Sequence, residues 1–519
     1  MEGAITGARS LLQTAASAGV DLCLANPGTT EMPLVAALDH VPQIRSVLGL
    51  FEGVCTGAAD GYGRMTGRPA LTLLHLGPGF ANGIANLHNA RRARTPIVNL
   101  IGDHASWHLD YDAPLTSDIE SLARPVSGWI RTSHSSKHLA NDVAEAIAAS
   151  VTPPGQVATL ILPADHQWGE GAGLAAVQSP PGPAGPDPDA VERAARRLRS
   201  AARSVILLGG DGLGDRAQRA AARVASAAGP ECQLFAETFP ARWERGAGLP
   251  AVSRLPYFPE QAAEALSGAD VVVLAGALSP VAFFGYEGQP SALAPDQSIA
   301  TLCRPDQDAT HALEALAIAI DAPPGTGAMA PPAAPDAPSG ALDPVAVAAA
   351  LAHALPEGAI VVDEAATSGL AFYGHSVGAA RHTVLSLTGG AIGQGLPCAT
   401  GAALACPDRK VVAFQADGSG QYTLQSLWTQ AREGLDVTTL LCSNRSYRIL
   451  QVELARAGVA EPGPQARSLT DLSRPDIDWV SLARGYGVPG ERIDSADALV
   501  RALPRALAEP GPHLLELVL

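Results

Sequence analysis

Short apolar runs without polar alternation recur along the whole chain and alternate with stretches of helical, amphipathic periodicity. Examples are ALTLLH at 70–75, SVILL at 204–208 and VVAFQA at 411–416. A strand that is apolar on both faces is covered on both faces, which is typical of parallel sheets. The pattern therefore predicts an α/β protein with doubly wound parallel sheets.

Two segments that are dense in Pro, Gly and Ala interrupt this alternation, at 177–190 and 322–344. They contain little that could pack into a core, so they are expected to be semi-stiff connectors. A chain of 519 residues is also too long for a single core. The sequence thus predicts three domains, at 1–176, 189–321 and 344–519, each of ordinary size.

The composition indicates which partners the protein is expected to lack and in which compartment it is expected to occur. Hydrophobic residues make up 47% of the chain, and the net charge is −16. A strongly acidic surface repels nucleic acid and anionic membranes, so neither is an expected partner. Seven cysteines without a C-x-x-C pair indicate reduced thiols. The N-terminus lacks the apolar core of a signal peptide, and no run reaches the roughly 20 residues of a membrane span. We expect a soluble, cytoplasmic protein.

Polar side chains follow two neighbouring apolar runs near the C-terminus. Asp417 ends 411–416, and Asn444 ends the next run 27 positions later, with a helical stretch between them. This spacing suits a βαβ unit, which places both side chains at one sheet edge. Their oxygens are hard ligands suited to Mg²⁺ or Ca²⁺. Gly418 permits close backbone approach, and the following helix N-terminus favours an anion, so a metal-bound diphosphate is predicted.

The alternative for these two residues is purely structural. Asp417 would cap the following helix, and Asn444 would sit in a turn. Each residue alone fits this alternative, but the pair at this spacing, with both members after apolar strands, favours the metal.

Two stretches then connect the sequence to a known family. The segment from Ala416 to Tyr447 resembles the thiamine diphosphate motif G-D-G followed about 27 residues later by N-N, with Ala416 and Ser443 replacing the first Gly and Asn. The segments 25–38 and 51–103 resemble the pyrimidine-binding domain of the same superfamily. The likeness covers nearly the whole chain and is closest to acetolactate synthase large subunits and benzoylformate decarboxylase. It implies the domain order pyrimidine-binding, middle, diphosphate-binding.

This resemblance assigns roles around the two rings of the cofactor. Glu52 matches the carboxylate that hydrogen-bonds ring N1′ and drives the 4′-amino group to deprotonate the thiazolium carbon. Without the resemblance, Glu52 would be an ordinary acid at a helix start. Ile392 matches the apolar side chain that bends the cofactor, and glycines such as Gly390 allow the backbone to approach it.

The resemblance also supplies a ligand set for the diphosphate. Asp417, Asn444 and a backbone oxygen near Ser446 would hold Mg²⁺, and diphosphate oxygens and a water would complete the octahedron. Thr367 and Ser419 are candidates to hydrogen-bond the diphosphate, and both could equally be capping residues.

The implied reaction begins with attack on the ketone carbon of a 2-oxo acid and loss of CO₂. Protonation then gives an aldehyde, and attack on a second carbonyl gives a hydroxy ketone or acetohydroxy acid. His75 matches an active-site histidine of benzoylformate decarboxylase and could carry the proton; the alternative is a structural histidine. Thr29 and Leu450 match substrate-pocket positions of that enzyme.

Other features favour the acetolactate synthases, so the substrate stays open between the two. The run GPGFANGIANLHNA is synthase-like, and Phe283, Phe284 and Tyr286 stand where the decarboxylase has a second histidine. FAD is possible but unsupported, because the glycine run at 209–214 lacks G-x-G-x-x-G spacing; a nicotinamide dehydrogenase rests on that run alone.

Two further expectations follow from the resemblance and its gaps. In the family the two halves of a site come from different subunits, which implies a homodimer or homotetramer. Ala416 and Ser443 leave open a non-catalytic homologue that binds thiamine diphosphate without turnover.

Overall fold

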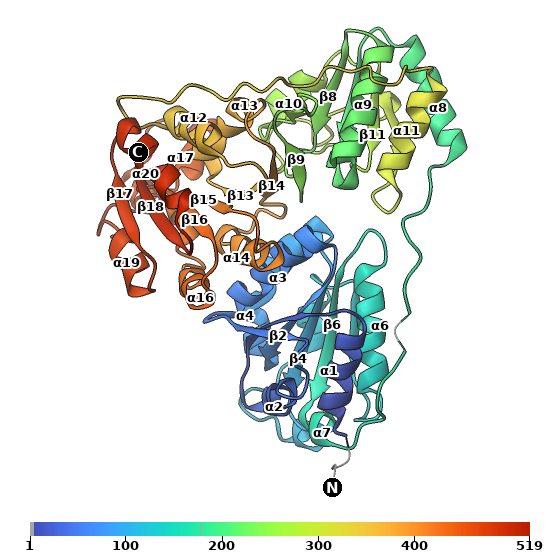
Figure 1. Ribbon diagram of the computed structural model, residues 1–519, viewed down its shortest axis with the longest axis vertical. Coiled ribbons are helices and arrows are strands. Elements are labelled where there is room, and N and C mark those ends of the chain that lie inside the picture. Colours follow the sequence, from blue (N-terminus) through green and yellow to red (C-terminus); the bar gives the residue numbers. More distant parts are fainter. Residues whose placement is uncertain (1–4, 177) are drawn as a thin grey trace.

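The computed structural model describes residues 5–176 and 178–519, and it contains three parallel-dominated α/β sheets, as predicted. Figure 1 shows them as three lobes, with the N-terminal lobe at the bottom, the middle lobe at upper right and the C-terminal lobe at upper left. The connectors run along the outside, one up the right-hand edge to the middle lobe and one across the top to the C-terminal lobe.

The N-terminal sheet has the order β2-β1-β3-β4-β6-β5, and all of its pairs are parallel. Its strands are β1 (Leu22–Asn26), β2 (Arg45–Leu48), β3 (Ala70–His75), β4 (Ile97–Asp103), β5 (Trp129–Thr132) and β6 (Val157–Pro163). Its helices are α1 (Gly7–Ser17), α2 (Met32–Leu38), α3 (Glu52–Thr66), α4 (Leu76–Ala93), α5 (Ile119–Ala123), α6 (Leu139–Val151) and α7 (Ala164–Trp168). Every residue of β4 and β6 is buried, as their unbroken apolar patterns predict.

The middle sheet has the order β10-β8-β7-β11-β12 and is also parallel. Its strands are β7 (Ser204–Leu208), β8 (Cys232–Ala236), β10 (Ser253–Arg254), β11 (Val271–Ala275) and β12 (Ile299–Cys303). Its helices are α8 (Pro188–Ser200), α9 (Asp215–Ala228), α10 (Pro259–Leu266) and α11 (Ala309–Ala319).

The C-terminal sheet has the order β17-β18-β16-β15-β13-β14-β9. Its strands are β13 (Ala359–Glu364), β14 (His382–Ser386), β15 (Val411–Ala416), β16 (Val437–Ser443), β17 (Gly490–Ile493) and β18 (His513–Val518), with β9 (Trp243–Arg245) at one edge. Its helices are α12 (Pro344–Ala354), α13 (Phe372–His375), α14 (Gly395–Ala405), α15 (Asp417–Gly420), α16 (Ser426–Glu433), α17 (Arg448–Arg456), α18 (Pro464–Ser468), α19 (Trp479–Gly485) and α20 (Ala496–Ala508). Strand β9 comes from the segment predicted as the middle domain, and it pairs antiparallel with β14.

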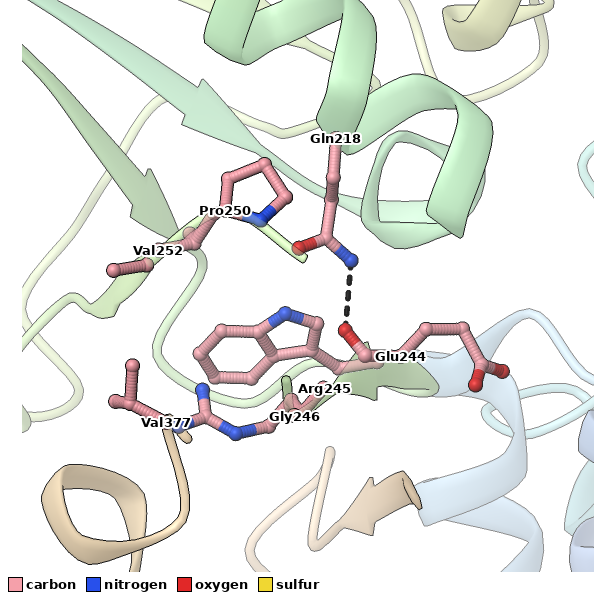
Figure 2. Close-up of a pocket in the computed structure, with 9 residues that line it drawn as sticks. Gln218, Glu244, Arg245, Gly246, Pro250, Val252 and Val377 are labelled. Atoms are coloured by element: carbon pink, nitrogen blue, oxygen red, sulfur yellow. Dashed lines mark hydrogen bonds between the residues drawn. The ribbon is translucent and has the colours of Figure 1, made fainter. Parts of the chain in front are cut away.

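The middle and C-terminal lobes meet around this added strand. A cavity of about 10 Å³ lies there. Figure 2 shows the residues that line it, among which Gln218 donates a hydrogen bond to the carbonyl of Glu244. The guanidinium of Arg245 lies 4.0 Å from the ring centroid of Trp243. A space of this size holds at most one water molecule, so the cavity is a feature of lobe packing.

The N-terminal and C-terminal lobes meet through α3 and α14 (Figure 1). Glycines make this approach close, since a Cβ on Gly61 would lie 2.0 Å from the carbonyl oxygen of Cys398. The start of α3 is thereby fixed beside the C-terminal lobe. Among the described residues, no helix is both long and apolar enough to span a membrane.

Candidate active site

Unusual backbone conformations gather where strands end. Six non-glycine residues in the described chain have positive φ, and three of them lie within two positions of the ends of β3, β13 and β16: Leu76, Ala366 and Arg445. Such conformations cost about 1–3 kcal/mol each and are commonest at functional sites. They coincide with the strand ends at which the sequence predicted chemistry.

Asp417 and Asn444 do lie together, as the βαβ prediction requires. Strands β15 and β16 are adjacent and parallel, so both residues emerge at the same sheet edge. One Asp417 oxygen accepts from Gly418 N at 2.8 Å, and the other accepts from Arg445 N at 2.6 Å. Asn444 Oδ1 accepts from Ser446 N at 3.0 Å. The three predicted metal ligands therefore form one cluster.

Among the described residues, no cationic side chain pairs with the carboxylate of Asp417. The residue is 2% exposed, and burial raises the pKa of its carboxyl group, while the backbone hydrogen bonds lower it. No salt bridge to Asp417 occurs within the described residues. Nor do these residues contain a group of three His, Cys, Asp or Glu side chains fit for a metal. The set fits Mg²⁺, which takes few protein ligands and fills its shell with phosphate oxygens and water.

The segment 389–395, here called the glycine loop, connects β14 to α14 and presents Ile392, which is half-buried. Gly390 and Gly393 have φ of 75° and 96°, where L side chains are strained. Within the described chain, the carbonyl of Gly390 and the N–H of Ile392 make no hydrogen bond. An acceptor and a donor two residues apart fit the amino and ring-nitrogen edge of an aminopyrimidine. The glycine loop therefore fits the cofactor.

Thr367 and Ser419 differ in what their hydroxyls can reach. Ser419 is buried, and its hydroxyl accepts from Gln415 Nε2 at 2.5 Å and donates to the carbonyl of Ala416 at 3.2 Å. That hydroxyl thus has partners inside its own lobe, which favours its structural role over a contact to diphosphate. Thr367 is half-buried in the turn after β13, and its role stays a prediction.

Glu52 is the first residue of α3 and lies at the carboxyl end of the N-terminal sheet. Asn82 on α4 donates to its carboxylate at 3.0 Å. A Cβ on Gly79 would lie 3.1 Å from a Glu52 oxygen and 3.3 Å from the Cβ of His75. Glu52 and His75 are therefore neighbours across Gly79.

His75 belongs to a polar cluster that the sequence did not reveal. Its Nδ1 lies 2.8 Å from an oxygen of Glu31, which is fully buried and also accepts from Gly28 N at 2.7 Å. The hydroxyl of Thr30 lies 3.2 Å from the same ring nitrogen. A Cβ on Gly28 would lie 2.3 Å from the imidazole, so only glycine leaves room for the ring. Such a carboxylate fixes the orientation and tautomer of a histidine.

The two predicted pocket residues are both solvent-exposed in the single chain. Thr29 precedes the cluster, and its neighbour Thr30 is the residue whose hydroxyl reaches His75. Leu450 lies on α17, which follows the cluster of predicted metal ligands, and its side chain is 47% exposed. Their assignment to a substrate pocket stays a prediction.

A network of hydrogen bonds joins the N-terminal acid to the glycine loop. Asn86 donates to the carbonyls of both Gly53 and Gly393, at 2.8 and 3.3 Å. Asp60, in a buried ion pair with Arg64, accepts from Gln394 Nε2 at 2.8 Å. The start of α3 therefore lies beside the glycine loop within one chain.

This arrangement corresponds to a known family. Residues 5–122 match the N-terminal TPP-binding domain of thiamine pyrophosphate enzymes, and residues 367–517 match their C-terminal TPP-binding domain. The chain belongs to the thiamine pyrophosphate enzymes.

Individual relatives cover the whole chain. The protein described as "Putative acetolactate synthase large subunit IlvX" of Mycobacterium tuberculosis is 50% identical, over 99% of both chains. Benzoylformate decarboxylase of Pseudomonas aeruginosa is 29% identical, over 96% of both. The structure of a thiamine diphosphate-dependent 4-hydroxybenzoylformate decarboxylase from Rhodococcus jostii has a TM-score of 0.84 at 25% identity, covering 98% of both chains.

Proposed function

We propose that this protein is a thiamine diphosphate- and Mg²⁺-dependent enzyme that decarboxylates 2-oxo acids, joins them to a second carbonyl compound, or does both, as acetolactate synthases do. The observation that carries the proposal is the buried carboxylate of Asp417 beside Asn444, which no cationic side chain among residues 5–176 and 178–519 balances. A Mg²⁺ ion held between this carboxylate and a diphosphate would supply the missing positive charge.

Each predicted residue then has a specific task. The cofactor would supply a nucleophilic carbon that adds to the ketone carbon and accepts the electron pair released with CO₂. Glu52 would hold a proton toward the aminopyrimidine ring, and Ile392 would fill the space beneath the bend. Asp417, Asn444 and Ser446 would hold Mg²⁺. The apolar glycine loop and Leu450 would exclude water from the reacting carbon, which favours loss of charge in that step.

A second candidate function, decarboxylation of an aryl 2-oxo acid to an aldehyde, is favoured by the His75 cluster. Glu31 engages Nδ1 of His75, which leaves Nε2 as the nitrogen that exchanges a proton with substrate. The ring of Phe283 also lies against Gly390, where it would flank an aromatic substrate. These features support a reaction in which protonation follows the loss of CO₂ and gives an aldehyde as product.

We further propose that the active sites are completed in a homodimer or homotetramer. Large apolar side chains at the carboxyl edges of both outer sheets stay exposed in the single chain: Met32, Leu50, Trp107, Tyr111 and Leu115 on the N-terminal lobe, and Leu370, Tyr422 and Leu450 on the C-terminal lobe. If the two sheet edges faced each other within one chain, these side chains would be covered, but they are exposed. A second copy, with its C-terminal edge against this N-terminal edge, is the partner that covers both.

The test is a panel of aliphatic and aryl 2-oxo acids with thiamine diphosphate and Mg²⁺, reading CO₂, aldehyde and acetohydroxy acid together. We expect CO₂ from at least one substrate and loss of its release in Glu52→Gln. Acetohydroxy acid identifies a synthase, and aldehyde alone identifies a decarboxylase. Cofactor binding without turnover across the panel would instead establish a non-catalytic homologue.

A further inference from the structure

Residues 389–394 of the glycine loop lie outside regular secondary structure, and Gly395 begins α14, so the shape of the loop depends on partners from elsewhere. Two of its seven residues, Gly390 and Gly393, have positive φ. A loop of this kind loses considerable conformational entropy when it is ordered, about 1–2 kcal/mol per residue. Something in the fold must offset that cost if the loop is to be shaped before a ligand binds.

The main partner is Glu364, the last residue of β13, which is 4% exposed. One of its oxygens accepts from Gly393 N at 2.8 Å and from Gln394 N at 3.1 Å. The other accepts from Gly395 N and from Gln415 Nε2, each at 2.8 Å. Four donors thus converge on one buried carboxylate, which stabilises a charge that burial alone would make costly.

The N-terminal lobe holds the opposite side of the same loop. Asn89 donates to the carbonyl of Ala391 at 2.8 Å and accepts from its N–H at 3.2 Å. With these bonds and those of Glu364 made, Gly390 O and Ile392 N are among the backbone groups of the loop that make no hydrogen bond in the described chain. Glu364 also reaches the Asp417 segment, because Gln415 bonds both Glu364 and Ser419.

We propose that Glu364 is a positioning residue that shapes the glycine loop before thiamine diphosphate binds and links it to the diphosphate segment. The inference rests on the proposed function, because it gives this carboxylate a task at the same cofactor site. Glu364 touches neither cofactor nor substrate; it acts through the backbone at 393–395.

The first experiment measures amide hydrogen exchange in the cofactor-free, full-length protein. We expect the amides of 393–395 to be protected to about the level of α14 itself. If they exchange as fast as the exposed loop at 285–288, the glycine loop is not preformed and the inference is overturned without any variant.

The second experiment measures binding of thiamine diphosphate with Mg²⁺ by calorimetry in Glu364→Gln. The amide is isosteric, but its NH₂ group must face a donor where the carboxylate accepted one. We expect the dissociation constant to rise about tenfold or more, the scale of a lost charge-assisted hydrogen bond, and protection at 393–395 to fall. Glu364→Asp keeps the charge and should recover part of both.

Two controls separate this role from a general effect on folding. Glu357 accepts one backbone hydrogen bond, from Arg381 N in the same lobe, so Glu357→Gln is a matched change away from the loop and should leave both readouts unchanged. The double variant Glu364→Gln/Gln415→Glu restores an amide–carboxylate pair between the two positions. The new amide at position 364 keeps one acceptor oxygen for Gly393 N and Gln394 N but turns its NH₂ group toward Gly395 N, so the double variant should not recover binding in full.

Equal binding and equal protection in wild type and Glu364→Gln, or full recovery in the double variant, would overturn the inference. Failure of the wild-type protein to bind thiamine diphosphate, with 393–395 still protected, would overturn the proposed function instead.

Discussion

At the residue scale, the fully buried Glu31 is the group that we expect to control His75. Glu31→Gln preserves shape but replaces the charged acceptor at Nδ1, so the imidazole is no longer held in one tautomer. If His75 carries the product proton, kcat should fall by about tenfold or more with little change in KM, since the lost interaction acts in a proton-transfer step. Steady-state kinetics on the best substrate of the panel measures this split.

The comparison for that measurement is Glu192→Gln, the same change at an exposed position of α8 in the middle lobe. It should leave kcat within about twofold, because the side chain of Glu192 makes no hydrogen bond or ion pair in the described chain and lies outside the proton path. A Glu31→Gln enzyme with unchanged kcat would show that the carboxylate serves only the fold of the turn before α2.

The sequence predicted some site residues and missed others for a physical reason. Asp417 and Asn444 were found because each directly follows an apolar strand, and parallel strands bring their ends together. Glu31 and Glu364 act through contacts with residues 44 and about 30 positions away, so no local pattern marks them. Ser419 shows the converse, since its neighbourhood suggested a ligand while its hydroxyl bonds Gln415.

At the scale of elements, the runs that were long and apolar were predicted, and the short ones were missed. The apolar runs at 70–75, 204–208 and 411–416 are the strands β3, β7 and β15. Strand β9 has three residues and β10 has two, too few for any periodicity to register. Their pairing depends on neighbours far along the chain: β9 pairs with β14, and there Trp243 stacks on Tyr373 and contacts the Arg245 guanidinium.

The contact between α3 and α14 gives a prediction about helix packing. Gly61→Ala places a methyl group 2.0 Å from the carbonyl oxygen of Cys398, so the helices must separate. We expect the variant to lose about 1–3 kcal/mol of stability, the usual cost of overpacking, seen as a lower thermal midpoint. Gly374→Ala in α13 is the matched control, because nothing lies within 4 Å of the added atom; it should be neutral or slightly stabilising. An unchanged midpoint in Gly61→Ala would mean that the two helices are not in close contact.

The end of β8 gives a prediction about pH. Burial raises the pKa of Glu237 to about 7 from 4.5, and Gly210 N donates to its carboxylate. The folded state therefore holds this proton more tightly than the unfolded state, so stability is full below about pH 4.5 and falls as the pH rises through 7. This decrease in the free energy of unfolding amounts to roughly 3 kcal/mol, and it is absent in Glu237→Gln. The variant should therefore become more stable relative to wild type as the pH rises from 5 to 8.

Thermal midpoints across that range measure the effect, and exposed Glu231→Gln at the start of the same strand is the comparison. A constant difference between Glu237→Gln and wild type at every pH would refute the assignment. The same carboxylate faces the glycine run at 209–214, since a Cβ on Gly209 would lie 3.0 Å from one of its oxygens.

At the scale of the whole molecule, the exposed apolar edges and the predicted division of the site lead to one experiment. Glu52→Gln removes the acid of the N-terminal lobe, and Asp417→Asn removes the metal carboxylate of the C-terminal lobe, so each homo-oligomer should be inactive. If an acid from one chain serves the cofactor on another, a hybrid of the two variants regains one intact site in each pair of sites. The purified hybrid should then have about half of wild-type activity, because one of its two paired sites is intact.

The two variants are co-expressed with different affinity tags, so that only hybrids are purified through both, and their activity is compared with that of doubly tagged Glu52→Gln alone. Within one chain, α3 already lies beside the glycine loop through Asn86, so a site closed inside each chain is the competing arrangement. It makes a distinct prediction, because no hybrid then contains an intact site and the purified species stays inactive. Recovery requires that Trp107, Tyr111 and their neighbours are covered by a second copy, which ties the exposed edges to catalysis.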